Sequence, residues 1–151
     1  MMPSETMLLF TILVPLAAVI GIVGVGRYPN LREAVSLTAA LVLIYLTYSL
    51  YRLTESGVAV SWEGLQILPG LPLFFNIEPL GMLFSLIGSF LWLITTLYAI
   101  GYMRGHQEEN QTRFYACFAI AISSVMGIAY AGNLFTLFIF YEILTLSTYP
   151  L

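Results

Sequence analysis

Lysine is absent from this chain of 151 residues, and cysteine occurs once, as Cys117. A single cysteine excludes an internal disulfide and any cysteine-rich metal or iron–sulfur site. The five basic residues are scattered arginines, so no basic tract suggests nucleic acid or a clamp on anionic lipid. Because the sequence also lacks a cofactor motif, a metal-ligand cluster and a Ser/His/Asp set, it predicts no cofactor and no redox or hydrolytic site.

Charge of either sign is scarce as well. Only 9% of the residues are charged, 60% are hydrophobic, and the net charge of −3 comes from scattered glutamates. In soluble domains roughly a quarter of the residues are charged. With a mean hydropathy of +0.92, the sequence predicts an integral membrane protein surrounded by lipid. In that solvent an all-α fold is expected, because each helix closes its own backbone hydrogen bonds.

Uncharged runs of spanning length follow one another along the chain. The sequence predicts a single transmembrane domain over residues 1–151, with five transmembrane helices in up-down order. Their predicted ranges are residues 7–26, 34–51, 79–103, 114–130 and 134–151. Pro29 and Asn30 are expected to break the chain before the second helix. Asn76 and Glu78 are expected to cap the third helix, where Pro79 suits the first turn.

The segment between the second and third helices differs from the rest in composition. Residues 54–78 are rich in glycine, proline and β-branched side chains. Such a composition interrupts helices and favours extended backbone. We therefore expect an extended segment or a hairpin at the membrane surface here.

The arginines also predict an orientation in the membrane. If the N-terminus faces outward, Arg27, Arg32, Arg104 and Arg113 are cytoplasmic, and only Arg52 lies outside. The positive-inside rule then favours an outer N-terminus.

Glu142 stands near the middle of the apolar stretch "NLFTLFIFYEILTLSTYPL". An acidic residue at the centre of a membrane helix costs roughly 3 kcal/mol on insertion scales, and such residues usually line a polar pathway or face a partner. On a helix, Phe138, Thr145, Leu146 and Tyr149 share the face of Glu142. Burial favours the neutral carboxyl group, whereas a nearby cation favours the charged form. The residues therefore predict a switchable proton site, with Thr145 and Tyr149 as a polar path.

Other interpretations of these residues stay open. Glu142 can be a structural residue that is hydrogen-bonded to a neighbouring helix or that reaches the membrane surface. Ser123 and Ser124, together with Gly127, form a small polar patch on the fourth helix. Close helix packing explains that patch first, and the wall of a water path beside Glu142 is the alternative.

The run "RFYACFAIAISSVMGIAYAGNLFTLFIFYEILTLSTYPL" resembles helices four and five of a known family. These are the antiporter-like proton-translocating subunits shared by complex I, Mrp-type cation/proton antiporters and membrane hydrogenases. "LPLFFNIEPLGMLFSLI" is similar to the segment that leads into the family's third helix, and "YAIGYM" to the end of that helix. Among the branches, the last stretch looks closest to D-type Mrp subunits.

The resemblance implies a larger protein than this chain. Family members have about fourteen membrane helices, with a second half that repeats the first in inverted form. In them the glutamate on helix five, here Glu142, pairs with a lysine on helix seven. The chain is therefore expected to be an N-terminal fragment or one part of a split subunit. The missing lysine would come from the remaining helices or from a partner in a multi-subunit antiporter or respiratory complex of the bacterial inner membrane.

Two further function classes are considered. A non-conducting structural or assembly subunit would need the helices but not the acidity of Glu142. An enzyme component that handles a lipid or a quinone is disfavoured, because the sequence holds none of the motifs such chemistry requires. Any oxidoreductase or hydrogenase activity would then belong to partner subunits.

Overall fold

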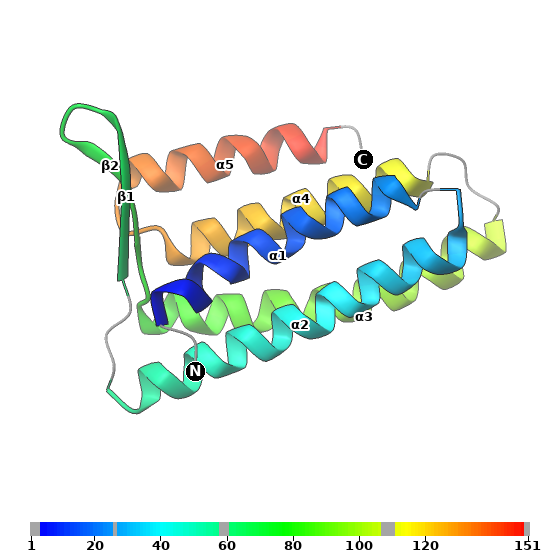
Figure 1. Cartoon of the computed structure of the whole chain (residues 1–151), viewed down its shortest axis with the longest axis horizontal. Helices are drawn as coiled ribbons and strands as arrows, with labels where there is room; N and C mark the ends of the chain where they lie inside the picture. The colour runs from blue at the N-terminus through cyan, green and yellow to red at the C-terminus, as the bar shows by residue number, and fades with distance from the viewer. Residues whose placement is uncertain (1–3, 26, 58–60, 107–110, 150–151) are drawn as a thin grey trace.

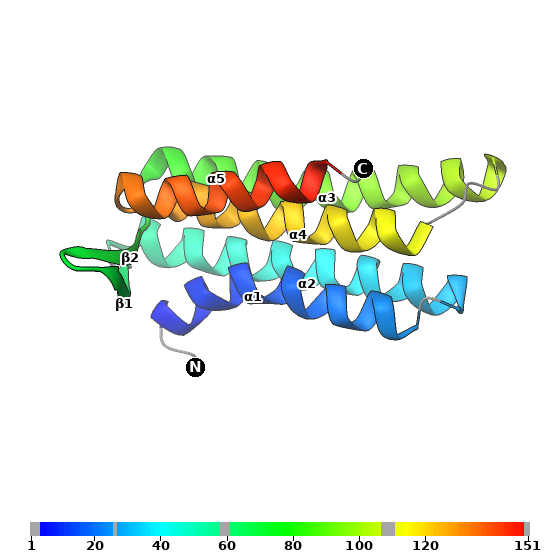
Figure 2. The same cartoon turned by 90° about the horizontal axis from the view of Figure 1, so that it is seen from above.

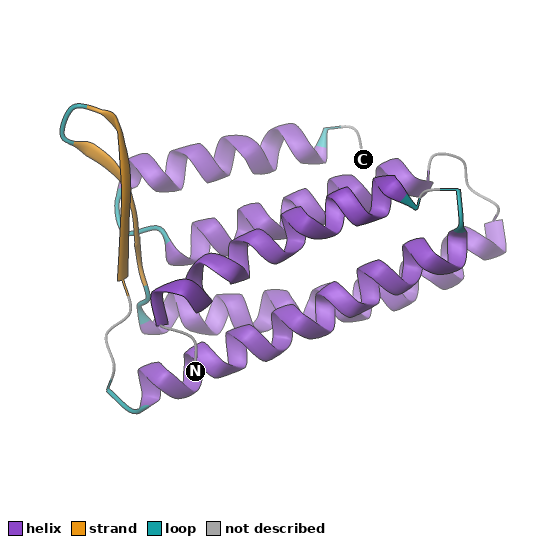
Figure 3. Cartoon of the chain, viewed as in Figure 1, coloured by secondary structure: helices purple, strands orange, loops and turns teal. Residues whose placement is uncertain are grey.

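The computed structural model describes residues 4–25, 27–57, 61–106 and 111–149. These residues form five helices and a two-stranded antiparallel sheet (Figures 1 and 3). In chain order the elements are α1 (Ser4–Gly24), α2 (Pro29–Glu55), β1 (Ser61–Leu68), β2 (Leu71–Asn76), α3 (Pro79–His106), α4 (Gln111–Tyr130) and α5 (Leu134–Thr148). The mostly helical fold and the hairpin between the second and third helices are as predicted.

Helices α1 to α4 form a closed bundle. α1 packs against α2 and α4, and α3 also packs against α2 and α4. α5 lies outside this four-helix bundle, where it contacts α4 and strand β2 (Figure 2). One side of α5 is therefore covered by the chain, and its other side faces away from the bundle.

Small and hydroxyl-bearing side chains carry part of the packing between helices. Ala40 and Ala119 are fully buried, and the hydroxyls of Thr47 on α2 and Ser89 on α3 lie 3.1 Å apart. In lipid the hydrophobic effect does not drive helices together, so close backbone approach and interhelical hydrogen bonds take its place. The bundle interior follows this rule.

Four helices are long and apolar enough to cross a membrane. The candidate spans are Thr6–Gly24, Asn30–Glu55, Pro79–Tyr102 and Thr112–Tyr130. A hydrocarbon core of roughly 30 Å needs about 20 helical residues. α5 is apolar but has 15 residues, which correspond to about 22 Å of helix. The structure thus supports four of the five predicted spans by length and composition.

The predicted range of the second helix was wrong at both ends. It was expected at residues 34–51, whereas α2 runs from Pro29 to Glu55. Pro29 begins the helix instead of breaking it, because a proline in the first turn loses no helical hydrogen bond. Tyr28, with extended backbone, takes the N-cap position.

Tertiary contacts explain why the charged start of α2 is helical. The guanidinium of Arg32 donates a hydrogen bond of 3.0 Å to the hydroxyl of Thr112 on α4. It also lies 5.4 Å from the ring centroid of Tyr115. Arg32 and Glu33 are both only 5% exposed. Both residues precede the predicted range of the helix, yet they lie within α2 at the packed end of the bundle.

The other four helices deviate less from prediction. Each differs from its expected range by at most three residues at either end. Hydropathy marks the apolar middle of a helix better than its polar first and last turns. Residue 26 of the first predicted range and residues 150–151 of the last lie outside the described residues.

α3 and α4 approach each other closely at Gly81, at the hairpin end of the bundle. A Cβ atom placed on Gly81 of α3 would meet the carbonyl oxygen of Ala129 on α4. The neighbour is backbone and cannot rotate away. Glycine is therefore required at this contact.

Gly81→Ala is expected to destabilise the bundle, because α3 must shift away from α4, at a cost of about 1–3 kcal/mol typical of overpacking. Gly101→Ala is the matched control, since Gly101 lies on the same helix with no neighbouring atom within 4 Å of an added Cβ. The control keeps or slightly raises stability through its helix propensity. Thermal unfolding in detergent measures both variants, and equal midpoints would contradict the close contact.

Candidate functional site

Asn133 joins the start of α5 to the hairpin. Its side-chain Oδ1 accepts a hydrogen bond of 2.7 Å from the backbone N–H of Thr136 and so caps the helix. Its Nδ2 donates a hydrogen bond of 3.0 Å to the carbonyl oxygen of Pro72, in β2. One side chain therefore satisfies a free amide of the helix and fixes the helix to the strand.

Hydrogen bonds of Phe74, in the hairpin, also connect the hairpin to the start of α5. The backbone N–H of Phe74 donates to the hydroxyl of Thr136 at 2.9 Å. The N–H of Gly132 donates to the carbonyl oxygen of Phe74 at 2.7 Å. A Cβ atom on Gly132 would meet the Phe74 ring. These contacts set the position at which α5 begins.

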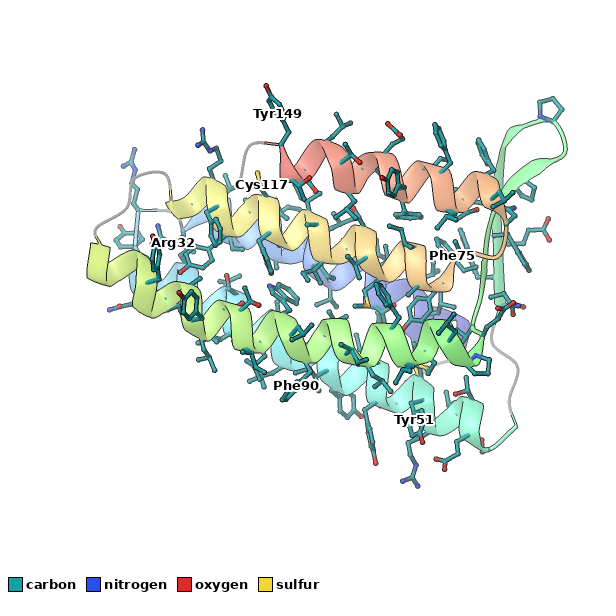
Figure 4. All side chains as sticks on the ribbon, turned by 180° about the vertical axis from the view of Figure 1, so that it is seen from behind. Arg32, Tyr51, Phe75, Phe90, Cys117 and Tyr149 are labelled. Atoms are coloured by element: carbon teal, nitrogen blue, oxygen red, sulfur yellow. The ribbon has the colours of Figure 1, made fainter. Side chains whose placement is uncertain are left out.

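Aromatic packing sets the rotation of α5 about its axis. Phe75, 3% exposed, lies between Trp62 and Phe140, with ring centroids 5.7 and 5.6 Å away. Phe140 in turn covers Gly127 on α4, where an added Cβ would meet its ring. α5 therefore turns Thr136 and Phe140 toward the rest of the chain. Figure 4 labels Phe75 at this end of the molecule.

Glu142 lies on the side of α5 that faces away from the bundle. Its side chain is exposed. Phe138 and Leu146, which were predicted to share its face, are 60% and 71% exposed. Within the described part of the chain, no hydrogen bond or ion pair of the Glu142 carboxylate is formed. The residues that the structure describes leave Glu142 exposed.

Thr145 and Tyr149, the predicted polar path, lie on the same side of α5 as Glu142, but the described residues enclose neither of them. Thr145 is exposed, and its hydroxyl donates to the carbonyl oxygen of Tyr141, one turn earlier, at 3.0 Å. Tyr149 is 91% exposed and points away from the bundle (Figure 4). Both residues lie on the open side of α5 with Glu142, and their role stays a prediction.

The two serines of α4 are deeply buried. The Ser123 hydroxyl donates a hydrogen bond of 2.7 Å to the carbonyl oxygen of Ile12 on α1. The Ser124 hydroxyl donates to the carbonyl oxygen of Ile120 within α4, at 2.9 Å. Ser123 thus links α4 to α1. Of the predicted patch, Gly127 is the member in contact with α5, through Phe140.

Asn76 and Glu78 lie directly before α3. Asn76 is the last residue of β2 and pairs with Ser61. The backbone carbonyl of Glu78 accepts a hydrogen bond of 2.9 Å from the N–H of Met82, which places Glu78 at the N-cap position. Its side chain is exposed. Side-chain capping by either residue stays a prediction.

Sequence reasoning overlooked Asn133, Thr136, Phe75 and Phe140. An asparagine before an apolar run is a recognised N-cap signal, so Asn133 could have been found from the sequence. Thr136 bonds to a residue 62 positions away, and no local pattern indicates such a contact. In the described residues no group of three or more His, Cys, Asp or Glu side chains could hold a metal.

Similar proteins are membrane subunits of two kinds. No protein-family profile matches the chain. It is 30% identical, over 98% of its length, to a probable K(+)/H(+) antiporter protein of the A/B type from Rhizobium meliloti. It is 35% identical, over 50% of its length, to the N-type subunit of an NADH-quinone oxidoreductase from Desulforudis audaxviator. Over 76% of its length it is 27% identical to the A1-type subunit of a Na(+)/H(+) antiporter from Staphylococcus aureus.

These relatives are much longer than this chain, which spans about 15% of the length of the first two. They are of the A/B, N and A1 types, so the predicted likeness to D-type subunits stays a prediction. A similar fold occurs in the "membrane-bound sulfane sulfur reductase (MBS), an archaeal respiratory membrane complex". The match has a TM-score of 0.75 at 17% identity and covers 92% of this chain and 21% of the other.

Substitution of Asn133 separates its two bonds. Asn133→Asp keeps the oxygen that caps α5 and removes the donor to Pro72, whereas Asn133→Ala removes both. We expect a loss of about 1 kcal/mol for each bond, so Asp is intermediate in thermal stability. Hydrogen exchange of the first-turn amides of α5 gives a local measure. Thr136→Ser, which retains the acceptor for Phe74, is the control for Thr136→Val. Equal exchange in all four variants would exclude this role of the hairpin.

Proposed function

This chain belongs to the antiporter-like membrane subunit family of Mrp-type antiporters and complex I, and we propose that it is part of a proton-translocating subunit. The proposal rests on one observation. α5 carries a single carboxylate, Glu142, among apolar residues, and this carboxylate faces away from the helices of the chain. An intramembrane acid of this kind indicates a functional site.

A further helix must cover Glu142 if α5 lies within the bilayer. A charged carboxylate facing lipid hydrocarbon is unfavourable, because neither water nor a counter-ion solvates it. The relatives are several times longer than this chain, so the remaining helices of such a protein, or those of a partner, can supply the cover. We propose that α5 is the fifth span of a subunit with about fourteen helices built from inverted repeats.

The chemistry of the site follows from two opposing effects. When a lysine ammonium lies beside Glu142, the charged carboxylate is favoured and the proton leaves. When the ammonium moves away, the dry surroundings favour the neutral acid, and a carboxylate oxygen takes up a proton. Movement of one positive charge then loads and unloads Glu142. An energy source elsewhere in a multi-subunit complex would drive that movement.

The polar path is proposed from the open side of α5. Thr145 and Tyr149 are exposed on the same side as Glu142, so a covering helix would enclose their hydroxyls with the carboxylate. The hydroxyls of Ser123 and Ser124 already donate hydrogen bonds to backbone carbonyls. We propose them only as polar wall on the α4 side.

The orientation is proposed from the arginine distribution. α1 begins at the same end of the bundle as the hairpin (Figure 1). An outer N-terminus therefore places the hairpin on the outer face of a bacterial cell membrane and the buried end of α2, with Arg32, on the cytoplasmic face.

A non-conducting structural subunit is the second candidate. The open side of α5 has large side chains that would pack against a partner whatever the state of Glu142, among them Phe138 and Tyr141, 60% and 58% exposed. In that case the carboxylate serves only as a hydrogen-bond acceptor for the partner. The two candidates differ in whether the acidity of Glu142 is needed.

Glu142→Gln is expected to lower proton translocation by about a hundredfold or more in vesicles with the assembled complex, because the amide keeps the shape but cannot exchange a proton at neutral pH. Dye quenching under an imposed driving force measures the proton gradient. Glu63→Gln, which neutralises an exposed glutamate on β1, is the control and should transport normally. Normal transport by a correctly assembled Glu142→Gln variant would favour the structural role.

A further inference from the structure

A cavity of about 420 Å³ lies between the end of α2 and the start of α3. Its walls come from the last turns of α2, the turn that follows, and the first two turns of α3. The lining includes Tyr51, Glu55, Glu78, Met82, Leu83 and Leu86. Figure 4 labels Tyr51 at this end of α2. The volume is within the range of small-molecule sites, about 300–1,000 Å³.

The ends of the candidate spans give the expected position of the cavity relative to the membrane. The candidate spans end at Glu55 and begin at Pro79, so Glu55 and Glu78 lie at the membrane boundary. Leu86 follows Pro79 by two helical turns and lies roughly 10 Å deeper. Leu83, on the same wall, is 55% exposed, which leaves the cavity open sideways to lipid.

The mouth of the cavity is acidic, and its inner wall is apolar. In the part of the chain that the structure describes, the side chains of Glu55 and Glu78 form no hydrogen bond. Arg52, one turn before Glu55, is directed back along α2, with 3.5 Å between its guanidinium and the hydroxyl of Tyr48. Glu55 also interacts electrostatically with Arg52. The carboxylates of Glu55 and Glu78 both line the mouth, above a wall of Met82 and leucine side chains.

We propose that this cavity binds a phospholipid with a primary amine headgroup, such as phosphatidylethanolamine. The ammonium donates charge-assisted hydrogen bonds to Glu55 and Glu78. One acyl chain lies along Met82, Leu83 and Leu86.

Other occupants match fewer features of the cavity. A metal cation would use the two carboxylates but leaves the apolar wall without a partner. A phosphatidylglycerol headgroup brings only negative charge to the acidic mouth. A choline headgroup is cationic but has no N–H to donate. The proposal concerns the hairpin end of α2 and α3 and is independent of proton transfer at Glu142.

Native mass spectrometry of the intact protein tests the site with three lipids of identical acyl chains: phosphatidylethanolamine, phosphatidylcholine and phosphatidylglycerol. We expect the ethanolamine lipid to bind about tenfold more tightly than the glycerol lipid, since two charge-assisted bonds are made. Glu55→Gln combined with Glu78→Gln should remove this preference. Leu83→Trp, which fills the apolar wall, should weaken all three lipids.

Glu63→Gln removes a carboxylate at the same end of the molecule without touching the cavity, and it should leave lipid selectivity unchanged. Circular dichroism confirms folding of each variant, and the single variant Glu55→Gln replaces the double variant if the latter does not fold. Equal affinity for the three lipids would overturn the proposal, as would an equal loss in Glu63→Gln. Displacement of the ethanolamine lipid by millimolar sodium or potassium would assign the carboxylates to a cation instead.

Discussion

The two hydrogen bonds of the Asn133 side chain connect the peripheral helix of this protein to the rest. One bond caps α5, and the other reaches the carbonyl of Pro72 in the hairpin. α5 is the only described helix outside the closed bundle of α1 to α4. Its start and its rotation therefore depend on the contacts with β2 and α4. Since Glu142 lies on α5, these contacts also decide which way the carboxylate faces.

The inner bundle and the peripheral helix differ in how many of their side chains contact other parts of the chain. Within α1 to α4, some buried polar side chains bond to a neighbouring helix, as in the bond from Ser123 to α1 and the contact of Arg32 with Thr112. On α5, Glu142, Phe138 and Tyr141 are exposed and face away from the other described helices. The family's longer subunits offer further helices to cover this side. The structure thus combines a closed four-helix bundle with a fifth helix whose outer side the described residues leave open.

The spans were predictable from the sequence because one property decides them. Each of the four long helices contains a long uncharged run, and lipid imposes the same requirement on all of them. The start of α2 was missed because Arg32 and Glu33 are charged, and only their contacts across the bundle explain their burial. The hairpin was predicted from its composition, but its docking on α5 joins residues 61 and 62 positions apart. The side of α5 that packs could not be predicted either, because this helix is apolar around most of its circumference.

The order of the docking partners along the chain has a consequence for biogenesis. Pro72, in β2, precedes Asn133 by 61 residues. α3 and α4 lie between them, as two candidate spans that run in opposite directions. The hairpin is therefore synthesised before α5 reaches the translocon. The first turn of α5 lies at the same end of the bundle as the hairpin. α5 then docks on a strand and a helix that were synthesised before it.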